Sequence, residues 1–387
     1  MTFESGLYDV KAKEAVRSLA TELGFDLVGI TSAEPFQEAE EITLERVRDG
    51  LMHGLPWFHE ARVKRGCNPQ DILPGARSII AVAMSYMAED PPQANDSASF
   101  KGKVARYAWG QDYHKVMERR LKLLAQRLSE RLDQPVQARV YVDTGPMLDR
   151  AVAERAGVGW FGKNTNVLTR SHGSWVFLGQ IITDLELEPD APSKKTCGQC
   201  RVCIDECPTG AIIAPYVLDN AKCISYLTIE LRGPVPRHLR PLVGDWVFGC
   251  DICQDVCPVN RKAQPTREPA FQPGEHGFPA LELLPLLKTT EEEFRARFAN
   301  SPIKRAKRAG LLRNVCVALG NIGDLKAVPA LAEALRHDIA LVRGHAAWAL
   351  GAIGGPEAEL ALRDALALEA DVDVREEIAE ALNSGSG

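Results

Sequence analysis

Eight of the ten cysteines in this 387-residue chain lie close together, between positions 197 and 257. They form two groups: Cys197-x2-Cys200-x2-Cys203-x3-Cys207-Pro208, and Cys223 followed by Cys250-x2-Cys253-x3-Cys257-Pro258. Cysteines spaced so tightly cannot form four long-range disulfides. They do allow a loop to wrap an inorganic cube with its thiolates pointing inward. The two groups therefore predict a pair of iron–sulfur clusters.

The spacing is that of the bacterial ferredoxin run, in which three cysteines hold one [4Fe–4S] cluster and the fourth ligates the other. By this crossed rule, the first cluster takes Cys197, Cys200, Cys203 and Cys257, and the second takes Cys207, Cys223, Cys250 and Cys253. Two structural zinc sites are the alternative, because C-x2-C pairs also bind zinc. The three-cysteine run that ends in Cys-Pro, together with its matching second half, favours the clusters.

The two remaining cysteines give weaker signals. Cys316 lies in an apolar helix pattern, LLRNVCVALG, and is predicted to be a core residue. Cys67 lies in a basic segment, RVKRGCNP, which is interpreted as a loop, and no role is assigned to it.

The N-terminus and the charge balance restrict the class of protein. The first residues, MTFESGLYDVKAKEAV, contain no apolar signal-peptide core, and the chain has no apolar run of about 18 residues that could span a membrane. We therefore expect a cytoplasmic protein with reduced thiols and no membrane partner. The net charge of −6 excludes a uniformly basic nucleic-acid binder, although not a local basic patch. Nothing in the sequence indicates an obligate dimer, so a monomer is expected.

The region before the cysteines alternates between helix and strand patterns. Helices are predicted at about 8–23, 36–52, 111–132 and 146–156, and strands at 78–86, 138–142 and 175–183. This pattern predicts a mixed α/β layer domain that is large enough to enclose a cofactor.

Three loops in this region carry polar or glycine-rich sequences: RYAWGQDYH at 106–114, DTGP at 143–146 and GVGWFGKNT at 157–165. The last contains G-x-G-x-x-G, but a helix precedes it and a strand follows, which inverts the context of a dinucleotide site. Asp112-x-His114 begins like the cobalt-ligating D-x-H-x-x-G motif, but Met117 occupies the glycine position. His114 is therefore not predicted to ligate cobalt, and a loop histidine hydrogen-bonded near a helix start is the plain alternative.

Asp143 is the most suggestive carboxylate, because it follows an apolar strand where side chains tend to face a cleft. A partly desolvated aspartate has its neutral form favoured and can deliver a proton. Asp143 could equally cap a helix that starts near Pro146. Both interpretations remain open at this point.

Taken together, ARYAWGQDYH, VDTGP, GWFGKNT, the two cysteine groups and a helical tail resemble the epoxyqueuosine reductases, over nearly the whole chain and in the family's order. These are cobalamin-dependent iron–sulfur enzymes of queuosine synthesis in tRNA. The resemblance implies base-off cobalamin, in agreement with the missing glycine, and it makes Asp143 the proton donor. It also implies corrinoid contacts from Arg65, Arg106, Asp143, Gly162, Lys163, Asn164 and Thr165.

The implied reaction passes electrons from an external low-potential donor through the clusters to cobalt. The epoxide is then reduced to an alkene, with its oxygen lost as water. A reductive dehalogenase-like enzyme acting on a small molecule is the alternative, but such enzymes carry a twin-arginine export signal that this N-terminus lacks. A plain electron carrier would leave the first 190 residues without a role.

The tail contains an internal repeat. Residues 316–323 (CVALGNIG) match 347–354 (AWALGAIG) at an offset of 31, and 374–382 echo 342–350 at an offset of 32. This period resembles HEAT-like helical repeats, with an ordinary helical extension as the alternative. The predicted fold is thus α+β and multidomain: a cobalamin-binding α/β catalytic domain at 1–190, a ferredoxin-like domain with two [4Fe–4S] clusters at 191–265, a connecting segment at 266–302 and HEAT-like repeats at 303–387.

A basic stretch begins the tail. From Arg295 to Arg313 there are seven Lys or Arg residues and no Asp or Glu. Such clusters bind phosphates without reading sequence, although a solvated helix face is the plain alternative. With the resemblance, the predicted tRNA contacts are Lys222, Arg232, Arg237, Lys304, Arg305, Lys307, Arg308 and Arg313. The epoxyqueuosine base of the anticodon stem-loop would have to flip into the cobalamin cavity.

Overall fold

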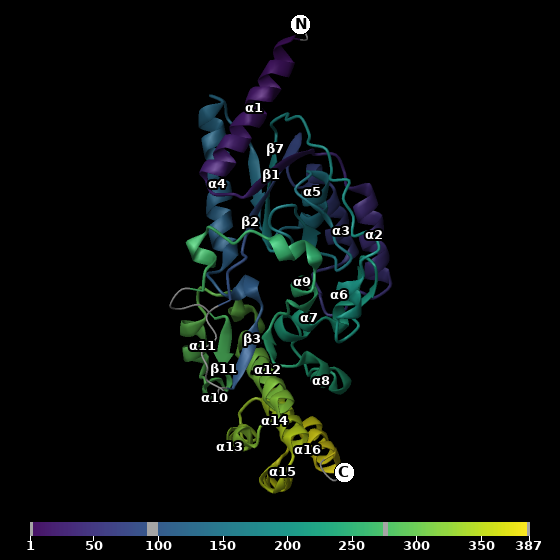
Figure 1. Ribbon diagram of the computed structural model, residues 1–387, viewed down its shortest axis with the longest axis vertical. Coiled ribbons are helices and arrows are strands. Elements are labelled where there is room, and N and C mark those ends of the chain that lie inside the picture. Colours follow the sequence, from purple (N-terminus) through teal and green to yellow (C-terminus); the bar gives the residue numbers. More distant parts are fainter. Residues whose placement is uncertain (1–2, 91–99, 274–277, 385–387) are drawn as a thin grey trace.

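The elements of the computed structural model, which describes residues 3–90, 100–273 and 278–384, follow one long axis (Figure 1). A sheet covered by helices lies at one end, the cysteine-rich segments lie in the middle, and the helical tail lies at the other end. In the described part of the chain, no helix combines the length and the apolar character that a membrane span requires.

A four-stranded antiparallel sheet forms the first part. Its order is β1 (Leu27–Ser32), β2 (Ser78–Ser85), β7 (Val176–Thr183) and β4 (Ala138–Tyr141). The three predicted strands are confirmed, while β1 was missed. Strand β2 is buried along its whole length, because helices cover the sheet on both faces.

The alternation of side chains along β2 divides the core into two layers. Ile80, Val82 and Met84 pack in one layer, with the helices α1 (Phe3–Glu22) and α4 (Tyr113–Arg131). Ile79, Ala81 and Ala83 pack in the other, with α2 (Gln37–Arg48), α3 (Glu60–Cys67) and α5 (Asp149–Arg155). Cys67 belongs to this second layer. It is the fully buried last residue of α3, so its assignment to a loop was wrong.

A second sheet joins segments that are distant in sequence. Its centre is β3 (Lys101–Val104), which pairs in parallel with β10 (Trp246–Phe248) and antiparallel with β11 (Ala280–Glu282). Val104 and Phe248 share a core with Leu311 and Val315 of the tail. This core therefore connects residues on both sides of the predicted domain boundaries.

The cysteine-rich segments contain short elements, because the chain must turn repeatedly around the thiols. These are α6 (Val202–Asp205), β8 (Ile212–Ala214), β9 (Val217–Leu218), α7 (Ile224–Ile229), α8 (Arg240–Val243) and α9 (Ile252–Asp255). Between the sheet and these segments lies the hairpin of β5 (Trp160–Phe161) and β6 (Val167–Leu168). The helices α10 (Leu283–Leu286) and α11 (Glu291–Arg297) and the 3-10 turn η7 (Pro302–Ala306) lead to the tail.

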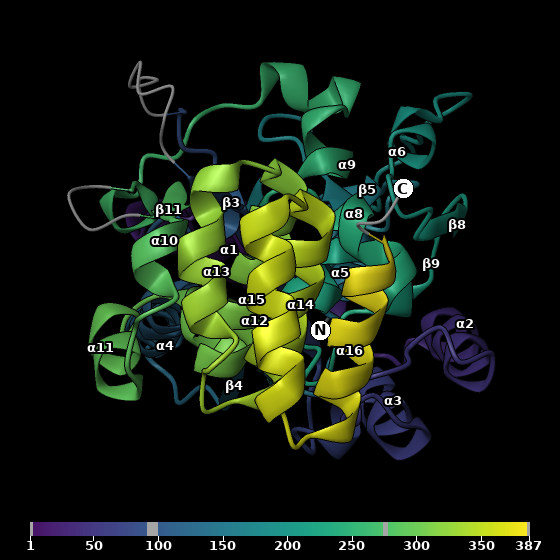
Figure 2. The same ribbon diagram turned by 90° about the horizontal axis from the view of Figure 1, so that it is seen from below.

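The tail is a two-layer helical array, which confirms the HEAT-like prediction (Figure 2). Its helices are α12 (Lys307–Ile322), α13 (Val328–Ala334), α14 (Ala340–Ile353), α15 (Pro356–Leu368) and α16 (Val372–Ser384). Helix α14 packs between α12 and α16. Cys316 is fully buried in α12, as predicted.

Two glycines at the repeat offset allow these helices to approach closely. A Cβ on Gly320 would lie 2.9 Å from Ala349 Cα, and a Cβ on Gly351 would lie 2.9 Å from Ala381 Cα. Real Cβ atoms do not approach backbone so closely, so larger residues would push the helices apart. The repeated glycine is therefore a packing requirement of the array.

We expect Gly351→Ala to lower the free energy of unfolding by about 1–3 kcal/mol, because the methyl group meets the backbone of α16. The matched control is Gly344→Ala on the same helix, where the nearest atom, Glu377 Cγ, lies 3.5 Å from the added Cβ. This control should be neutral or stabilising by up to about 1 kcal/mol through helix propensity. Denaturant unfolding of both variants checks the prediction, and equal stabilities would contradict it.

Candidate functional site

A cavity of about 1010 Å³ opens between the sheet and the cysteine-rich segments. Its walls come from α2, α3, α5, the loop after β4, the β5–β6 hairpin and β9. The cavity is lined by aromatic side chains, including Trp57, Phe161 and Phe177, and by polar groups such as the Tyr113 hydroxyl and the Asp143 carboxylate. Small-molecule sites usually enclose about 300–1,000 Å³, so this cavity suits a large ligand.

Asp143 lies at the wall of this cavity, two residues after β4. Its backbone adopts a left-handed φ of 61°, which is uncommon for a residue with a side chain and occurs more often at functional sites. The Tyr113 hydroxyl donates a hydrogen bond to Asp143 Oδ2, and His114 Nε2 lies 3.5 Å from the same oxygen. The side chain keeps 60% of its surface accessible, because it faces the open cavity.

Both sequence-based interpretations of Asp143 need correction. Burial opposes ionisation of this carboxyl, but hydrogen bonds from His114 and Tyr113 outweigh it and lower its pKa. The neutral form is therefore not favoured in the resting site. Asp143 is not a helix cap either, because α5 begins at Asp149 and the residue before it is Leu148.

Two further residues of this wall escaped the sequence analysis. Asp149 Oδ1 accepts hydrogen bonds from Gln180 Nε2 at 3.1 Å and from the Asp143 amide at 3.4 Å. Burial, and then the charge of Asp143, raise the pKa of Asp149 to about 7. Arg62 lines the cavity and donates to the Gly145 carbonyl at 2.5 Å. No motif marked either residue, because their role depends on tertiary neighbours.

The predicted corrinoid contacts lie in different places. Among Gly162, Lys163, Asn164 and Thr165, Thr165 lines the cavity. Lys163 Nζ donates to the carbonyls of Gly198 at 2.7 Å and Cys200 at 2.9 Å. Asn164 Nδ2 donates to the Cys253 carbonyl at 3.2 Å. This loop therefore connects the cavity wall to both cysteine groups.

The two predicted arginines lie away from the cavity. Arg65 is exposed in the last turn of α3, and Arg62, one turn earlier, faces the cavity instead. Arg106 is buried, with its guanidinium donating to the Ala88 carbonyl and, at 2.9 Å, to Asp90 Oδ1. The described geometry thus gives neither Arg65 nor Arg106 a contact with the cavity.

The cysteine thiols gather in the two predicted sets. Burial raises the pKa of Cys203 to about 11, with further contributions from Cys257, Cys197 and Cys200. Burial also raises the pKa of Cys250, to which Cys223 and Cys207 contribute, and the pKa of Cys253, to which Cys223 and Cys250 contribute. Thiols that influence each other in this way are spatial neighbours, even though the chain separates them.

The number of clustered thiols matches two iron–sulfur cubes. In the described ranges, no group of three or more His, Cys, Asp or Glu side chains is arranged to hold one metal ion. Two sets of four thiols supply the eight ligands that two [4Fe–4S] clusters need.

The cavity also fits a corrinoid that has no histidine beneath its cobalt. The histidine nearest Asp143 is His114, and its ring nitrogens face Asp112 at 2.7 Å and Asp143 at 3.5 Å. Both nitrogens are engaged by carboxylates. His114 is therefore not arranged as a metal ligand, and the large aromatic cavity remains as the place for the ring.

The predicted RNA contacts differ in how far their side chains are exposed to solvent. Arg313 is fully buried and donates to the carbonyls of Leu227, Leu231 and Gly233, so its assignment to tRNA was wrong. Arg308 is largely buried against Thr289 and His337. Arg237 is bound to Glu377 and Glu380 of α16. The more exposed members are Lys222, Arg232, Lys304, Arg305 and Lys307.

Arg305 connects this exposed group to the cavity. Its guanidinium lies 5.2 Å from the ring of Trp57, which lines the cavity, and its charge helps to lower the pKa of Asp143. Its Nε also donates to Glu230 at 2.7 Å. We call Lys222, Arg232, Lys304, Arg305 and Lys307 the basic rim.

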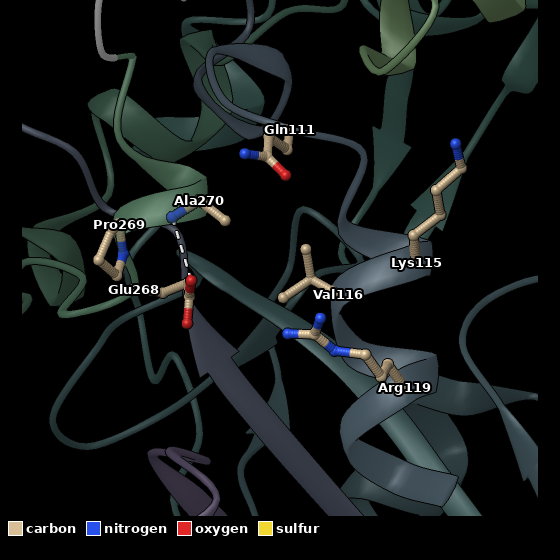
Figure 3. Close-up of a pocket in the computed structure, with 7 residues that line it drawn as sticks. All are labelled: Gln111, Lys115, Val116, Arg119, Glu268, Pro269 and Ala270. Carbon is tan, nitrogen blue, oxygen red and sulfur yellow. Dashed lines mark hydrogen bonds between the residues drawn. The ribbon is translucent and has the colours of Figure 1, made fainter.

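A smaller cavity, of about 530 Å³, lies beside α4 and contains Lys115, Arg119 and Glu268 (Figure 3). Glu268 is already engaged, because its Oε1 accepts from the Ala270 amide at 3.0 Å and its Oε2 from Arg120. These contacts fix the segment 268–271 against α4. The larger cavity, with Asp143 and the cluster loops, is therefore the candidate site.

Comparison with known proteins agrees with this geometry. Residues 67–144 match a family model described as Epoxyqueuosine reductase QueG, DUF1730. Residues 196–260 match a 4Fe-4S double cluster binding domain, and residues 304–383 match HEAT repeats. The matched ranges contain Asp143, all eight clustered cysteines and most of the tail.

Curated relatives carry the same name. The chain is 43% identical to the epoxyqueuosine reductase of Xanthomonas campestris, over 89% of this chain and 96% of that protein. It is 42% identical to the Pseudomonas aeruginosa protein, over 87% and 93%. A crystal structure of epoxyqueuosine reductase with an epoxyqueuosine-modified tRNA-Tyr stem loop superposes with a TM-score of 0.91 at 34% identity, covering 98% of this chain and 100% of the other. The chain belongs to the epoxyqueuosine reductase family.

Proposed function

We propose that this chain reduces the epoxide of epoxyqueuosine in tRNA to the alkene of queuosine, with the oxygen lost as water. The observation that carries the proposal is the position of Asp143, at the wall of a large cavity that is also lined by a loop hydrogen-bonded to both cysteine groups. Family membership and the stem-loop complex of a relative support the same substrate.

Two kinds of cofactor complete the site. Base-off cobalamin, when bound in the cavity, supplies the strong reductant for C–O cleavage, and the two [4Fe–4S] clusters supply it with single electrons from an external low-potential donor. Thr165 and the aromatic walls would hold the corrinoid. Cys197, Cys200, Cys203 and Cys257 would hold one cluster, and Cys207, Cys223, Cys250 and Cys253 the other.

The protein's own chemistry centres on the oxygen that leaves. Breaking the C–O bond of an epoxide generates an alkoxide unless a proton arrives. Asp143 faces the cavity and is held in place by a hydrogen bond from Tyr113. Because it is a carboxylate at rest, it must take up a proton before it can pass one to that oxygen.

The substrate must reach the cavity as a flipped base, while the rest of the stem-loop stays outside. We assign the phosphate contacts to the basic rim, of which Arg305 lies against the cavity residue Trp57. We further propose that the enzyme acts as a monomer. A tRNA substrate and eight thiolate ligands support a location in the reducing cytoplasm, which is part of the proposal.

Asp143→Asn should keep both clusters and cobalamin but lose roughly 10²–10⁴-fold in single-turnover rate, because the amide has the same shape and no acidic proton. The rate is measured with cobalamin-loaded enzyme and epoxyqueuosine stem-loop, and absorption spectra report the cofactors. A rate near that of the wild type, with intact spectra, would remove Asp143 from its role.

The crossed ligand sets predict how iron is lost. Cys203→Ser and Cys257→Ser should each lose about half of the bound iron, and the double variant should lose no more than either single variant. If Cys257 belonged to the other cluster, the double variant would lose nearly all the iron. Cys316→Ala is the matched control, because this cysteine is buried in the tail and should leave the iron content unchanged.

Arg305→Gln should weaken binding of the stem-loop and reduce the salt dependence of binding by about one counterion. The matched control is Arg363→Gln, an exposed arginine of α15 that also pairs with a glutamate, Glu359. Dissociation constants at several salt concentrations check the prediction. If both variants bind as the wild type does, the basic rim is not the RNA contact.

A further inference from the structure

His114 belongs to a row of alternating charges that runs from the tail to Asp143. Lys304 Nζ of η7 lies 2.6 Å from Asp112 Oδ2. Asp112 Oδ1 lies 2.7 Å from His114 Nδ1, and His114 Nε2 lies 3.5 Å from Asp143 Oδ2. The row ends at the cavity, where the substrate oxygen is expected.

The imidazole in this row is held rigidly. Asp112 is the N-cap of α4 and accepts a hydrogen bond from the His114 amide at 3.3 Å, which fixes the start of the helix. The imidazole ring stacks on Tyr113 at 4.0 Å, and Tyr113 stacks on Phe177 at 4.0 Å with an interplanar angle of 5°. His114 therefore points its Nε2 toward Asp143, and an approach of a few tenths of an ångström from 3.5 Å would bring the pair to hydrogen-bond length.

The resting proton lies on the histidine rather than on the aspartate. Burial lowers the pKa of His114, but hydrogen bonds and charges from Asp112 and Asp143 outweigh it and raise the pKa to about 9. Asp143, by contrast, has a lowered pKa and is a carboxylate. Near neutral pH, the pair thus holds one proton, on His114.

The proposed reaction consumes two protons and two electrons for each epoxide, because the oxygen leaves as water. Asp143 can deliver one proton at a time and must then be reloaded. One third of the His114 side chain is solvent-accessible, so it can recover a proton from water. The row therefore contains Asp143, the proton donor that faces the substrate, and His114, which can supply Asp143 with further protons.

We propose that His114 is the positioning residue that loads Asp143 with each proton of the reaction. The inference rests on the function proposed above. In each transfer the Nε2–H bond breaks and an O–H bond forms on Asp143, which passes the proton to the substrate oxygen. The first transfer accompanies C–O cleavage, and the second releases the hydroxyl as water. The two electrons come from the external donor, and neutral His114 regains its proton from solvent.

The charge of His114 depends on every group around it. Asp112 and Tyr113 lie next to it in sequence, Asp143 faces it across the cavity wall, and Lys304 balances the far oxygen of Asp112. Tyr107 and Arg305 interact with Asp143. Because the carboxylates dominate, His114 is charged below about pH 9, and the transfer is lost as the pH rises through this value.

The test uses the full-length, cobalamin-loaded enzyme and its single-turnover rate across pH 6–10.5. His114→Gln should lower the plateau roughly 10- to 100-fold and abolish the alkaline fall near pH 9, because an amide can hydrogen-bond Asp143 but has no proton to give. Asp112→Asn keeps a good N-cap but removes a negative neighbour, so the alkaline fall should move to lower pH. If the role of His114 were only structural, the pH of the alkaline fall in rate would not change.

A second readout does not need activity. Histidine ring resonances of the protein without cobalamin should show His114 titrating near pH 9, and at a lower pH in Asp112→Asn, where Asp143 is the remaining carboxylate neighbour. His238→Gln, an exposed histidine of the turn before α8, is the control for rate and pH profile. The His114 inference would be overturned if His114→Gln kept the wild-type rate and the wild-type alkaline fall, or if His114 of the wild type titrated near 6.5. Neither outcome would affect the proposed function. A wild-type enzyme without turnover would overturn the proposed function, and the relay with it.

Discussion

The crossed cysteine sets are the constraint on which the rest of this structure depends. Cys257 joins three cysteines from the far side of the sequence, and Cys207 joins the opposite set, so neither half of the segment 197–257 can close its thiols alone. The chain between the two cysteine groups must fold back on itself, so the segment 197–257 contains only short helices, short strands and turns. Stability must then come from neighbours. β10 pairs with β3, and Asn314 of α12 donates to the carbonyls of Thr228 and Val247, at 2.8 Å in each case.

The buried arginines show how the tail attaches to this segment. Arg313 places its guanidinium among the carbonyls of Leu227, Leu231 and Gly233, which would otherwise end a short helix without partners. Arg240 is fully buried and pairs with Glu377 of α16 at 2.7 Å. Removing either partner of such contacts leaves a buried polar group unsatisfied, which costs several kcal/mol. Part of the basic character of this region is therefore structural, and the rest faces solvent.

The sequence predicted the features that depend on local periodicity or on ligand spacing. The strands at 78–86, 138–142 and 175–183, the repeat offset and the burial of Cys316 all follow from such patterns. It could not predict features that depend on distant partners. Arg313 and Arg305 look alike in one basic run, but Arg313 contacts backbone carbonyls, whereas Arg305 pairs with Glu230 at the surface.

Likewise, the ionisation of Asp143 is decided by His114 and Tyr113, which reach it from α4. Arg62 lines the cavity and Arg65 does not, although they are neighbours on one face of α3, because the cavity lies against the earlier turn of the helix.

The loop at 162–165 has a consequence for the order in which the protein matures. One wall of the cavity is held by hydrogen bonds from Lys163 and Asn164 to the carbonyls of Gly198, Cys200 and Cys253. These carbonyls are fixed only when the cysteine loops have folded, and loops of this kind fold around their metal. In the proposed enzyme, cobalamin would therefore meet a fully formed wall only after the clusters are in place. A shortage of iron or sulfide would then distort the cavity as well as interrupt the supply of electrons.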